Sequence, residues 1–452
     1  MADKIPQPSG VSAISKNLIG DVLSAAQHVL GKEWTPQAQD YVRKHAEHYR
    51  EVMFKLAAAS SRGRKRQVRR RSFMAEHSFS CRLCAFLLGY SNGGKKLTLA
   101  EAIMMANQVS LRKPSAEKIR ALEIEKPEGG KRLIMIFGEL DRAAKRLTDD
   151  LLRTIWGISP YEYSQRGRGR DAAIRETIQS FNEGGARRII KVDIKGFYQS
   201  VDMEKLEPLI PLPLSVIRTT LRIPSTKAID LSLAPTTSEK AVRMGLIAGS
   251  RPSALIASRV FEPMLQDLPG ARLALNHGDD GIVTVRTDVQ AETVKMTLAL
   301  RAEEHPCGPF KLKELEVLRM GKVHDLLGCI IRHRLKAYGG GARVSASQKA
   351  ILRFQRKLAR KLALLPISSW EQIAEKKCRG WVASFGQWKH DGSVVDIALQ
   401  ELEDEVYPVL IAFQKHVKGK GFPSFADLMK LFDADFLPSI GKQWKTLKGS
   451  AA

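Results

Sequence analysis

Apolar residues recur at helical spacing through the first part of this chain. The segments LIGDVLSAAQHVL (18–30) and DYVRKHAEHYREVMFKLAAA (40–59) carry them three or four positions apart, so each predicts an amphipathic helix. The pattern stops at residues 61–72, because seven of the ten residues Arg62–Arg71 are Lys or Arg. Such a run is typical of a solvated or disordered segment, or of a nucleic-acid contact. We therefore predict a helical N-terminal extension over residues 1–114.

Strand and helix patterns are mixed between residues 115 and 340. Helices are predicted over 141–156, from Pro252 to 268, and over 288–305, and residues 201–245 indicate a mixed insertion of helix and loop. Strands are predicted in ALEIEKPEGGKRLIMIF (121–137, a hairpin), ARRIIKVDIKGFY (186–198), ARLALNHGDDGIVTVRT (271–287, a second hairpin) and VHDLLGCIIRHRLKAY (323–338, a strand pair). Hairpins without a repeated βαβ unit favour an α+β fold with an antiparallel sheet.

Beyond residue 345 the pattern becomes helical again, and we assign 341–452 to a helical C-terminal part. In SQKAILRFQRKLARKLALL (347–365) the apolar residues share one face and basic residues cover the others. Ser345 or Ser347 is the expected N-cap. The basic faces are either an ordinary solvated surface or a contact for a nucleic-acid backbone.

The charge balance indicates which class of partner this chain binds. The chain has 452 residues, with 73 Lys and Arg against 48 Asp and Glu, a formal net charge of +25. A field of this sign attracts polyanions, so nucleic acid is the expected partner and an anionic membrane surface the weaker alternative. The candidate nucleic-acid contacts are Arg62, Arg64, Lys65, Arg66, Arg69, Arg70, Arg353, Arg356 and Arg360.

Compartment and cofactor signals are weaker. No apolar run approaches the ~20 residues of a membrane helix, and the first residues lack the apolar region of a secretory signal. Five scattered cysteines indicate a reducing cytoplasm rather than a disulfide framework. His77, Cys81 and Cys84 form a lone CxxC with a nearby histidine, which is a weak indication of zinc. Buried or surface thiols are the favoured interpretation.

Three carboxylates on two predicted strands carry the candidate chemistry. Asp193 ends the apolar run IIKV, and Asp279 and Asp280 lie at the turn of the HGDD hairpin. Adjacent carboxylates repel each other and are costly to desolvate. If both strands belong to one sheet, the three can converge on Mg²⁺, or Mn²⁺ in its place, since hard divalent cations prefer oxygen ligands. Two such ions about 4 Å apart suit phosphoryl transfer. Two adjacent aspartates in a surface turn are common and by themselves do not indicate a metal site, so the interpretation depends on the surrounding motifs.

The order of motifs from 115 to 390 resembles that of reverse transcriptases. The fingers hairpin of these enzymes is resembled by KPEGGKRLIMI (126–136), and the segment that follows it by YEYSQRGRGRDAAI (161–174). Motif A is resembled by KVDIKGFYQSVD (191–202), motif B by GLIAGSRPSALIA (245–257), motif C by HGDD (277–280), and motifs D and E by residues 310–331. A thumb segment of group II intron-type enzymes is resembled by KKCRGWVASFGQW (376–388). The resemblance implies a right-hand polymerase, with fingers and palm over 115–340 and a helical thumb beyond. It also implies dNTPs, an RNA template and a DNA product as partners.

The resemblance also implies residue roles. Asp193 and Asp279 correspond to the residues that ligate the catalytic metals, and Asp280 completes the cluster. Tyr198 matches the aromatic residue that excludes a ribose 2′-OH. Arg132, with Lys131 or Lys126 as substitutes, would hold the triphosphate. Three further residues belong to the implied nucleotide site: Gly249 and Ser250 beneath the base pair, and Lys313 as the motif D lysine.

Departures from the family pattern narrow the subgroup. Ile247 and Ala248 stand where motif B carries proline and glutamine, and His277 and Gly278 where motif C carries tyrosine and a small residue. This motif B resembles that of bacterial phage-defence reverse transcriptases, of the abortive-infection or unknown groups, which implies a non-coding RNA template in a bacterial cytoplasm.

Three other functions stay open: an RNA-dependent RNA polymerase, a catalytically retired RNA-binding scaffold, and a group II intron-like mobile-element protein. Priming mode, product sequence and self-association as a homo-oligomer are likewise undetermined by the sequence.

Overall fold

The computed structural model describes residues 17–90, 95–125, 131–164, 168–313, 315–319, 323–334 and 341–347. It also describes residues 350, 353–354, 357–358, 362, 369, 372–374 and 376–377. The chain divides into two compact units, one formed by 1–167 and 189–317, the other by 168–188 and 318–452. No helix among the described residues combines the length and the apolar character needed to cross a membrane. The boundaries at 114/115 and 340/341 stay predictions.

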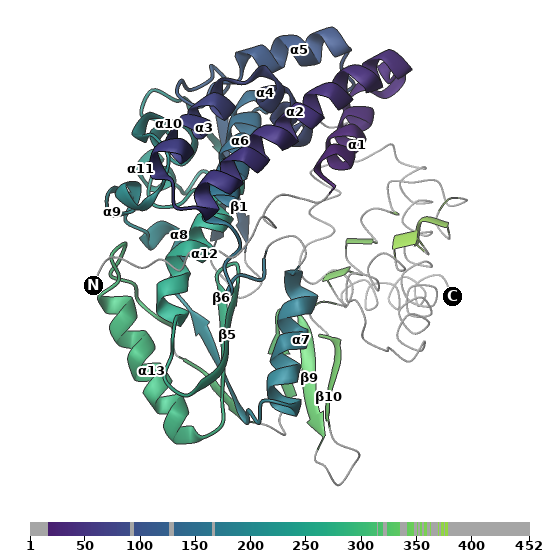
Figure 1. Cartoon of the computed structure of the whole chain (residues 1–452). Helices are drawn as coiled ribbons and strands as arrows, with labels where there is room; N and C mark the ends of the chain where they lie inside the picture. The colour runs from purple at the N-terminus through teal and green to yellow at the C-terminus, as the bar shows by residue number, and fades with distance from the viewer. Residues whose placement is uncertain are drawn as a thin grey trace, which may run out of the picture. The chain divides into compact units, whose positions relative to one another are not determined.

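The N-terminal part is helical, as predicted. Its helices are α1 (Leu18–Leu30), the 3₁₀ turn η2 (Gly31–Glu33), α2 (Pro36–Ser61), α3 (Lys65–His77), α4 (Phe79–Gly89) and α5 (Leu99–Gln108), which lie together in Figure 1. Thr35 caps α2 by accepting a hydrogen bond from the Ala38 amide, and Thr98 begins α5 with a capping box. The basic segment is ordered rather than disordered: α3 begins at Lys65, and Ser72, Ala75 and Glu76 give it a buried side.

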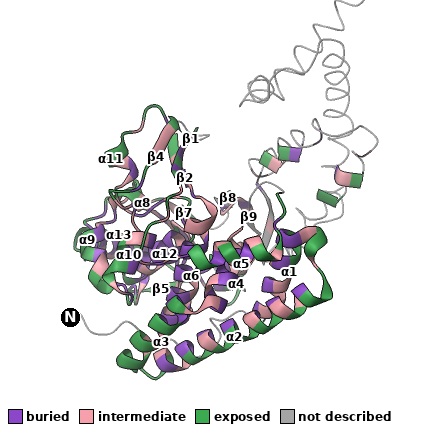
Figure 2. Cartoon of the chain, turned by 90° about the horizontal axis from the view of Figure 1, so that it is seen from above, coloured by how far each residue is buried: buried purple, intermediate pink, exposed green. Residues whose placement is uncertain are grey.

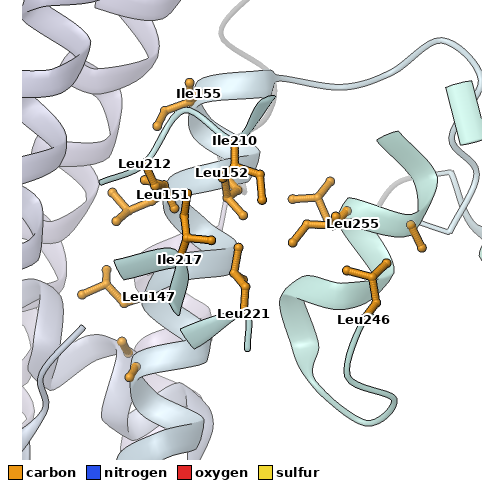
Figure 3. Close-up of a cluster of buried hydrophobic side chains, with 14 of the residues drawn as sticks. Leu147, Leu151, Leu152, Ile155, Ile210, Leu212, Ile217, Leu221, Leu246 and Leu255 are labelled. Atoms are coloured by element: carbon orange, nitrogen blue, oxygen red, sulfur yellow. The ribbon is translucent and has the colours of Figure 1, made fainter. Parts of the chain in front are cut away.

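Helix α6 (Glu139–Trp156) is the centre of the first unit and packs against α2, α4 and α12. Leu147, Leu151 and Leu152 on it are almost fully buried: Leu147 and Leu151, four positions apart, share a helix face, and Leu152 widens it. Figure 3 shows this face meeting Leu246 and Leu255. Burying a leucine side chain contributes about 2 kcal/mol, so this cluster is a main source of the unit's stability. In Figure 2, α4 and α6 are largely buried, whereas α2 and α3 show exposed outer sides.

The four-stranded sheet that carries the candidate site has the order β5-β6-β3-β7. Its strands are β3 (Arg188–Asp193), β5 (Ala271–His277), β6 (Asp280–Val285) and β7 (Val317–Arg319). The predicted hairpin is confirmed, because β5 and β6 pair antiparallel and His277 lies opposite Asp280. Helices α12 (Arg251–Leu265) and α13 (Asp288–Glu303) also follow the prediction. Thr287 starts α13 with a capping box.

A second sheet, in the order β2-β1-β4, contains the other predicted hairpin. Strands β1 (Ile119–Glu125) and β2 (Lys131–Ile136) pair antiparallel, and β4 (Ile229–Leu233) adds a parallel strand that the sequence did not predict. The rest of the 201–245 insertion forms α9 (Met203–Leu206), η3 (Glu207–Leu209), α10 (Leu214–Thr220) and α11 (Glu239–Val242).

The second unit pairs helix α7 (Gly169–Asn182) with a small antiparallel sheet in the order β10-β9-β8 (Figure 1). Its strands are β8 (Val323–Leu326), β9 (Cys329–Arg334) and β10 (Gly341–Ala346). The helical prediction is wrong for the start of the C-terminal part, because residues Gly341–Ala346 pair with the neighbouring β9 and form strand β10. The Ala350 amide donates to the Ser347 hydroxyl, the geometry expected of the predicted cap.

Candidate active site

The sheet brings Asp193 and the HGDD turn onto neighbouring strands. Asp193 is the last residue of β3, and Asp280 is the first residue of the adjacent β6. Gly281 makes this close approach feasible, since a Cβ there would lie 2.9 Å from the Val192 Cβ and 2.8 Å from the Phe261 ring. The predicted convergence of the three carboxylates therefore has a structural basis in the sheet order.

Asn276 holds the turn that carries Asp279. Its side-chain amide donates to the Gly278 carbonyl at 3.2 Å and to the Ser258 hydroxyl on α12 at 2.8 Å, and the side chain is fully buried. Gly278 has φ 69°, and a positive φ at the first of two central residues is typical of a tight hairpin turn. The Asn276 backbone is held too, because its carbonyl accepts from the Tyr163 amide at 2.8 Å. The turn is thus fixed from both sides.

The carboxylates interact electrostatically. The pKa of Asp280 is raised to about 6, first because surrounding protein atoms exclude water from its carboxylate and then because Asp279 and Asp193 repel its charge. Lys313 and Arg132 act in the opposite direction. Asp280 still has an exposed surface, so solvent screens part of this effect.

Lys313 lies directly opposite Asp193. Its backbone amide donates to the Asp193 carbonyl at 2.8 Å, and its ammonium donates to Asp193 Oδ2 at 2.5 Å. The bridge between Ile194 and Leu312 continues this antiparallel contact by one residue pair. The motif D lysine predicted from the sequence is therefore at the acidic cluster.

The chemistry of these carboxylate donors suits a hard divalent cation. Carboxylate oxygens are the ligands that Mg²⁺ prefers, and the repulsion that raises the pKa of Asp280 is the charge that such a cation would offset. Within the described ranges, no three His, Cys, Asp or Glu side chains are grouped tightly enough to form a ready cation site. Lys313 instead supplies the positive charge at Asp193.

Tyr198 lies in a helical turn rather than on the predicted strand. The strand prediction over 186–198 is wrong beyond Asp193, because Gly196 adopts the left-handed conformation at φ 62° and starts α8 (Phe197–Ser200). The pKa of Tyr198 is raised to about 12, mainly by burial and further by the charge of Asp279. Tyr198 is therefore close enough to the acidic turn to interact with it electrostatically.

Gly245 was overlooked as a site residue, and it fixes the position of Tyr198. It has φ 62°, and a Cβ at this position would lie 2.2 Å from the Tyr198 carbonyl oxygen. The next residue's amide, that of Leu246, donates to the same oxygen. The first glycine of the motif B resemblance was the available signal.

The basic candidates on β2 separate into two environments. Arg132 lowers the pKa of both Tyr198 and Asp280, which places its guanidinium near the site. Lys131 instead donates to Glu123 at 2.8 Å on β1, as expected when neighbouring strand residues point to opposite faces. Lys126 lies outside the described residues.

Gly249 and Ser250 connect the motif B segment to β2. Gly249 has φ 90°, and a Cβ there would lie 2.7 Å from the Met135 carbonyl oxygen. The Met135 amide donates to the Ala248 carbonyl at 2.9 Å. The buried Ser250 hydroxyl has no hydrogen-bond partner among the described residues. The loop is thus packed tightly against the strand that carries Arg132.

The remaining candidates are the basic residues and the CxxC cysteines. Arg62, Arg64, Lys65, Arg66, Arg69 and Arg70 are exposed at the start of and along α3, and Arg353 is exposed, whereas Arg356 and Arg360 lie outside the described residues. Cys81 and Cys84 are buried in α4, where burial raises the pKa of both thiols, that of Cys81 to about 12.

One comparison with known proteins gives a match. Residues 124–307 match the family model described as "Reverse transcriptase (RNA-dependent DNA polymerase)". The matched segment contains all three aspartates, Tyr198 and Arg132. No curated protein matches the chain.

Proposed function

We propose that this chain is an RNA-directed DNA polymerase, a nucleotidyltransferase with a polymerase-like α+β fold, because residues 124–307 match the reverse transcriptase family model. Such domains bind a nucleic-acid template and dNTPs and generally use divalent metal ions such as Mg²⁺. We propose that Asp193, Asp279 and Asp280 form its catalytic centre. The observation that carries this proposal is the adjacency of β3 and β6 inside the matched segment, together with the repulsion by which Asp279 and Asp193 raise the pKa of Asp280.

Asp193 and Asp279 would hold the divalent ions, and Asp280 would add negative charge to the cluster. Mg²⁺ held by these residues would supply positive charge for the primer hydroxyl, the triphosphate and the charge that develops between them. Asn276 keeps the Asp279 turn in place through its bond to the Gly278 carbonyl. The chain thus contributes a fixed acidic platform.

Nucleotide binding follows from the groups that surround this platform. Arg132 would pair with phosphate oxygens, which charge-assisted hydrogen bonds from a guanidinium favour. Tyr198, fixed by Gly245, would pack beneath the sugar and select dNTPs. Lys313 would exchange its Asp193 partner for the departing pyrophosphate and supply a proton there.

Primer extension on a defined RNA template tests the proposal. The purified chain should add dNTPs in Mg²⁺, and Asp193→Ala, Asp279→Ala and Asp280→Ala should each abolish addition while RNA affinity is retained. Asp40→Ala is a matched control, because Asp40 is exposed on α2 and pairs with Lys44. Unchanged incorporation by the Asp279 variant would refute the catalytic assignment.

An RNA-dependent RNA polymerase is the second candidate, favoured by the Gly278-Asp279-Asp280 sequence. Tyr198 beside Asp279 argues against it, because an aromatic residue at that place would collide with a ribose 2′-OH. Preference for NTPs over dNTPs by the unsubstituted protein would establish this alternative. Retention of all three aspartates argues against a retired scaffold.

At a finer level we propose a right-hand arrangement, with fingers and palm over 115–340 and a thumb over 341–452. The motif B resemblance supports a non-coding RNA template and a role in bacterial phage defence rather than in intron mobility. Sequencing the nucleic acid that co-purifies with the protein tests this, since a single recurrent non-coding RNA is expected. Recovery of intron RNA would favour the mobile-element alternative.

A further inference from the structure

Helix α3 presents an exposed stripe of arginines and aromatic rings that the catalytic assignment does not use. Arg66, Arg70, Phe73 and His77 recur at intervals of four, three and four residues, so they share one face. The opposite side, with Ser72, Ala75 and Glu76, is buried. The helix is therefore anchored by one face and open on the other (Figure 2).

The aromatic part of the stripe is held in place. Phe73 is 51% exposed, and its ring centroid lies 4.2 Å from that of His77. The Arg112 guanidinium lies 5.6 Å from the Phe73 centroid, and its Nη2 donates to the buried Glu76 carboxylate at 3.0 Å. Glu76 thus fixes Arg112 over the Phe73 ring, so the exposed phenyl group is supported rather than loosely tethered.

The charges on this face are free to bind a ligand. Arg66, Arg69 and Arg70 form no ion pair within the described part of the chain, and the one acidic residue of α3 is Glu76, already paired with Arg112. Three unpaired guanidinium groups along about one and a half helical turns match the repeated charge of a nucleic-acid backbone. A nearby exposed ring can stack on a base only if that base is unpaired.

We propose that this face of α3, defined by Arg66, Arg69, Arg70, Phe73 and His77, binds single-stranded RNA by stacking a base on Phe73 between arginine–phosphate contacts. The choice of RNA over DNA rests on the proposed function, in which the template is RNA. A membrane surface is the less favoured occupant, because the exposed apolar area on α3 is limited to Phe73 and Met74, far less than an interfacial helix buries.

Fluorescence anisotropy with a short unstructured RNA tests the stacking contact. Binding is measured without dNTPs in the Asp279→Ala chain, so catalysis plays no part. Phe73→Ala should weaken binding about 5- to 150-fold, the range for loss of one base–aromatic stack, and Phe73→Trp should restore it. The matched control is Phe54→Ala. Phe54 is 52% exposed, like Phe73, but the residues three and seven positions before it on its helix are the acidic Glu51 and Glu47. An unaltered affinity in Phe73→Ala, or an equal loss in Phe54→Ala, overturns the proposal.

The salt dependence tests the arginines. The combined Arg66→Gln, Arg69→Gln and Arg70→Gln variant should flatten the slope of log affinity against log salt by roughly 2, since each contact to a single strand contributes about 0.7. Arg43→Gln with Arg50→Gln, on the exposed side of α2, should leave the slope unchanged. Equal flattening by both variants would refute a specific surface.

The choice of ligand is tested with duplex RNA, single-stranded DNA of the same sequence, and vesicles of phosphatidylglycerol and phosphatidylcholine. Tighter Phe73-dependent binding of single-stranded RNA than of each of these supports the proposal, and equal or tighter binding of any of them overturns it. If the unsubstituted chain adds no dNTP yet keeps Phe73-dependent RNA binding, the polymerase proposal fails and the RNA surface stands. The converse result removes the surface alone.

Discussion

Replacing Asn276 by alanine should impair catalysis without touching any of the three aspartates. The side-chain amide of Asn276 tethers the Gly278 carbonyl, one residue before Asp279, to the Ser258 hydroxyl on α12. Alanine removes both bonds and leaves the fully buried Ser258 hydroxyl without this partner. The HGDD turn then loses its side-chain support.

The magnitude follows from the buried hydrogen bonds. Loss of the bond to Gly278 costs about 1 kcal/mol net, and the Ser258 hydroxyl left unpaired costs about 1–3 kcal/mol, so Asn276→Ala should lower the free energy of unfolding by roughly 2–4 kcal/mol. Domains with a stability of about 5–15 kcal/mol stay folded after such a loss. A displacement of the Asp279 carboxylate by about 1 Å should lower kcat by up to about 100-fold.

The assay combines urea unfolding with steady-state dNTP incorporation in Asn276→Ala and Ser258→Ala. The Ser258 variant keeps the Asn276 bond to Gly278, so it should lose stability with a much smaller loss of kcat. Equal loss of kcat in both variants, or full activity in Asn276→Ala, would refute a positioning role for the amide. Unchanged stability of Asn276→Ala would refute the buried hydrogen bonds themselves.

Three further predictions concern the same site. Gly245→Ala should lower the free energy of unfolding by roughly 1–2 kcal/mol because of the left-handed backbone alone, which urea unfolding measures. The clash of the new Cβ with the Tyr198 carbonyl should raise the KM for dNTPs, which steady-state kinetics measures. The folded pKa of Asp280, about 6, lies above its ordinary value of 3.8, so its ionisation lowers stability as pH rises from about 4 to 6. Asp280→Asn should therefore stabilise the metal-free protein above pH 6, by about 1 kcal/mol after solvent screening, and should not stabilise it near pH 4. Thermal unfolding across this pH range measures the difference in stability between the two proteins. A difference that does not change with pH would contradict the repulsion. Arg132→Ala should lower kcat/KM for dNTPs by about 10- to 100-fold, as expected for the loss of one charged hydrogen bond. Lys131→Ala should change kcat/KM little, because Lys131 is paired with Glu123 on β1. Equal effects in the two variants would contradict different roles for the two residues.

Much of the fold could be predicted from periodicity because long helices and hairpins carry strong local signals. The helix predicted over 141–156 is α6, and the hairpin predicted around HGDD is β5 and β6. Strand β4 escaped prediction because its partner β1 lies about a hundred residues earlier in the chain, and pairing of that kind leaves no local pattern. Strand β10 has a partner close in sequence, since β9 ends at Arg334; it was missed because residues 341–346 were assigned to the helical C-terminal part.

The charged residues of the candidate site could be predicted from the sequence, but the residues that hold them in position could not. Asp193, Asp279 and Asp280 are conspicuous in a chain of net charge +25, and motif order suggested their convergence. Asn276 is an ordinary polar residue in an alternating strand, and only the fold shows that its amide reaches Gly278. The split between Arg132 and Lys131 likewise depends on which face of β2 meets the site.

RNA-templated DNA synthesis by the purified chain is the most direct test of the central claim. On one preparation, a defined RNA template and annealed primer are incubated with Mg²⁺ and dNTPs, and the products are sequenced for the unsubstituted chain and for Asp279→Asn. DNA complementary to the template from the unsubstituted chain alone, with equal RNA affinity in both proteins, is the predicted result. The same DNA from both proteins would contradict catalysis at Asp279, and RNA products from NTPs would contradict reverse transcription.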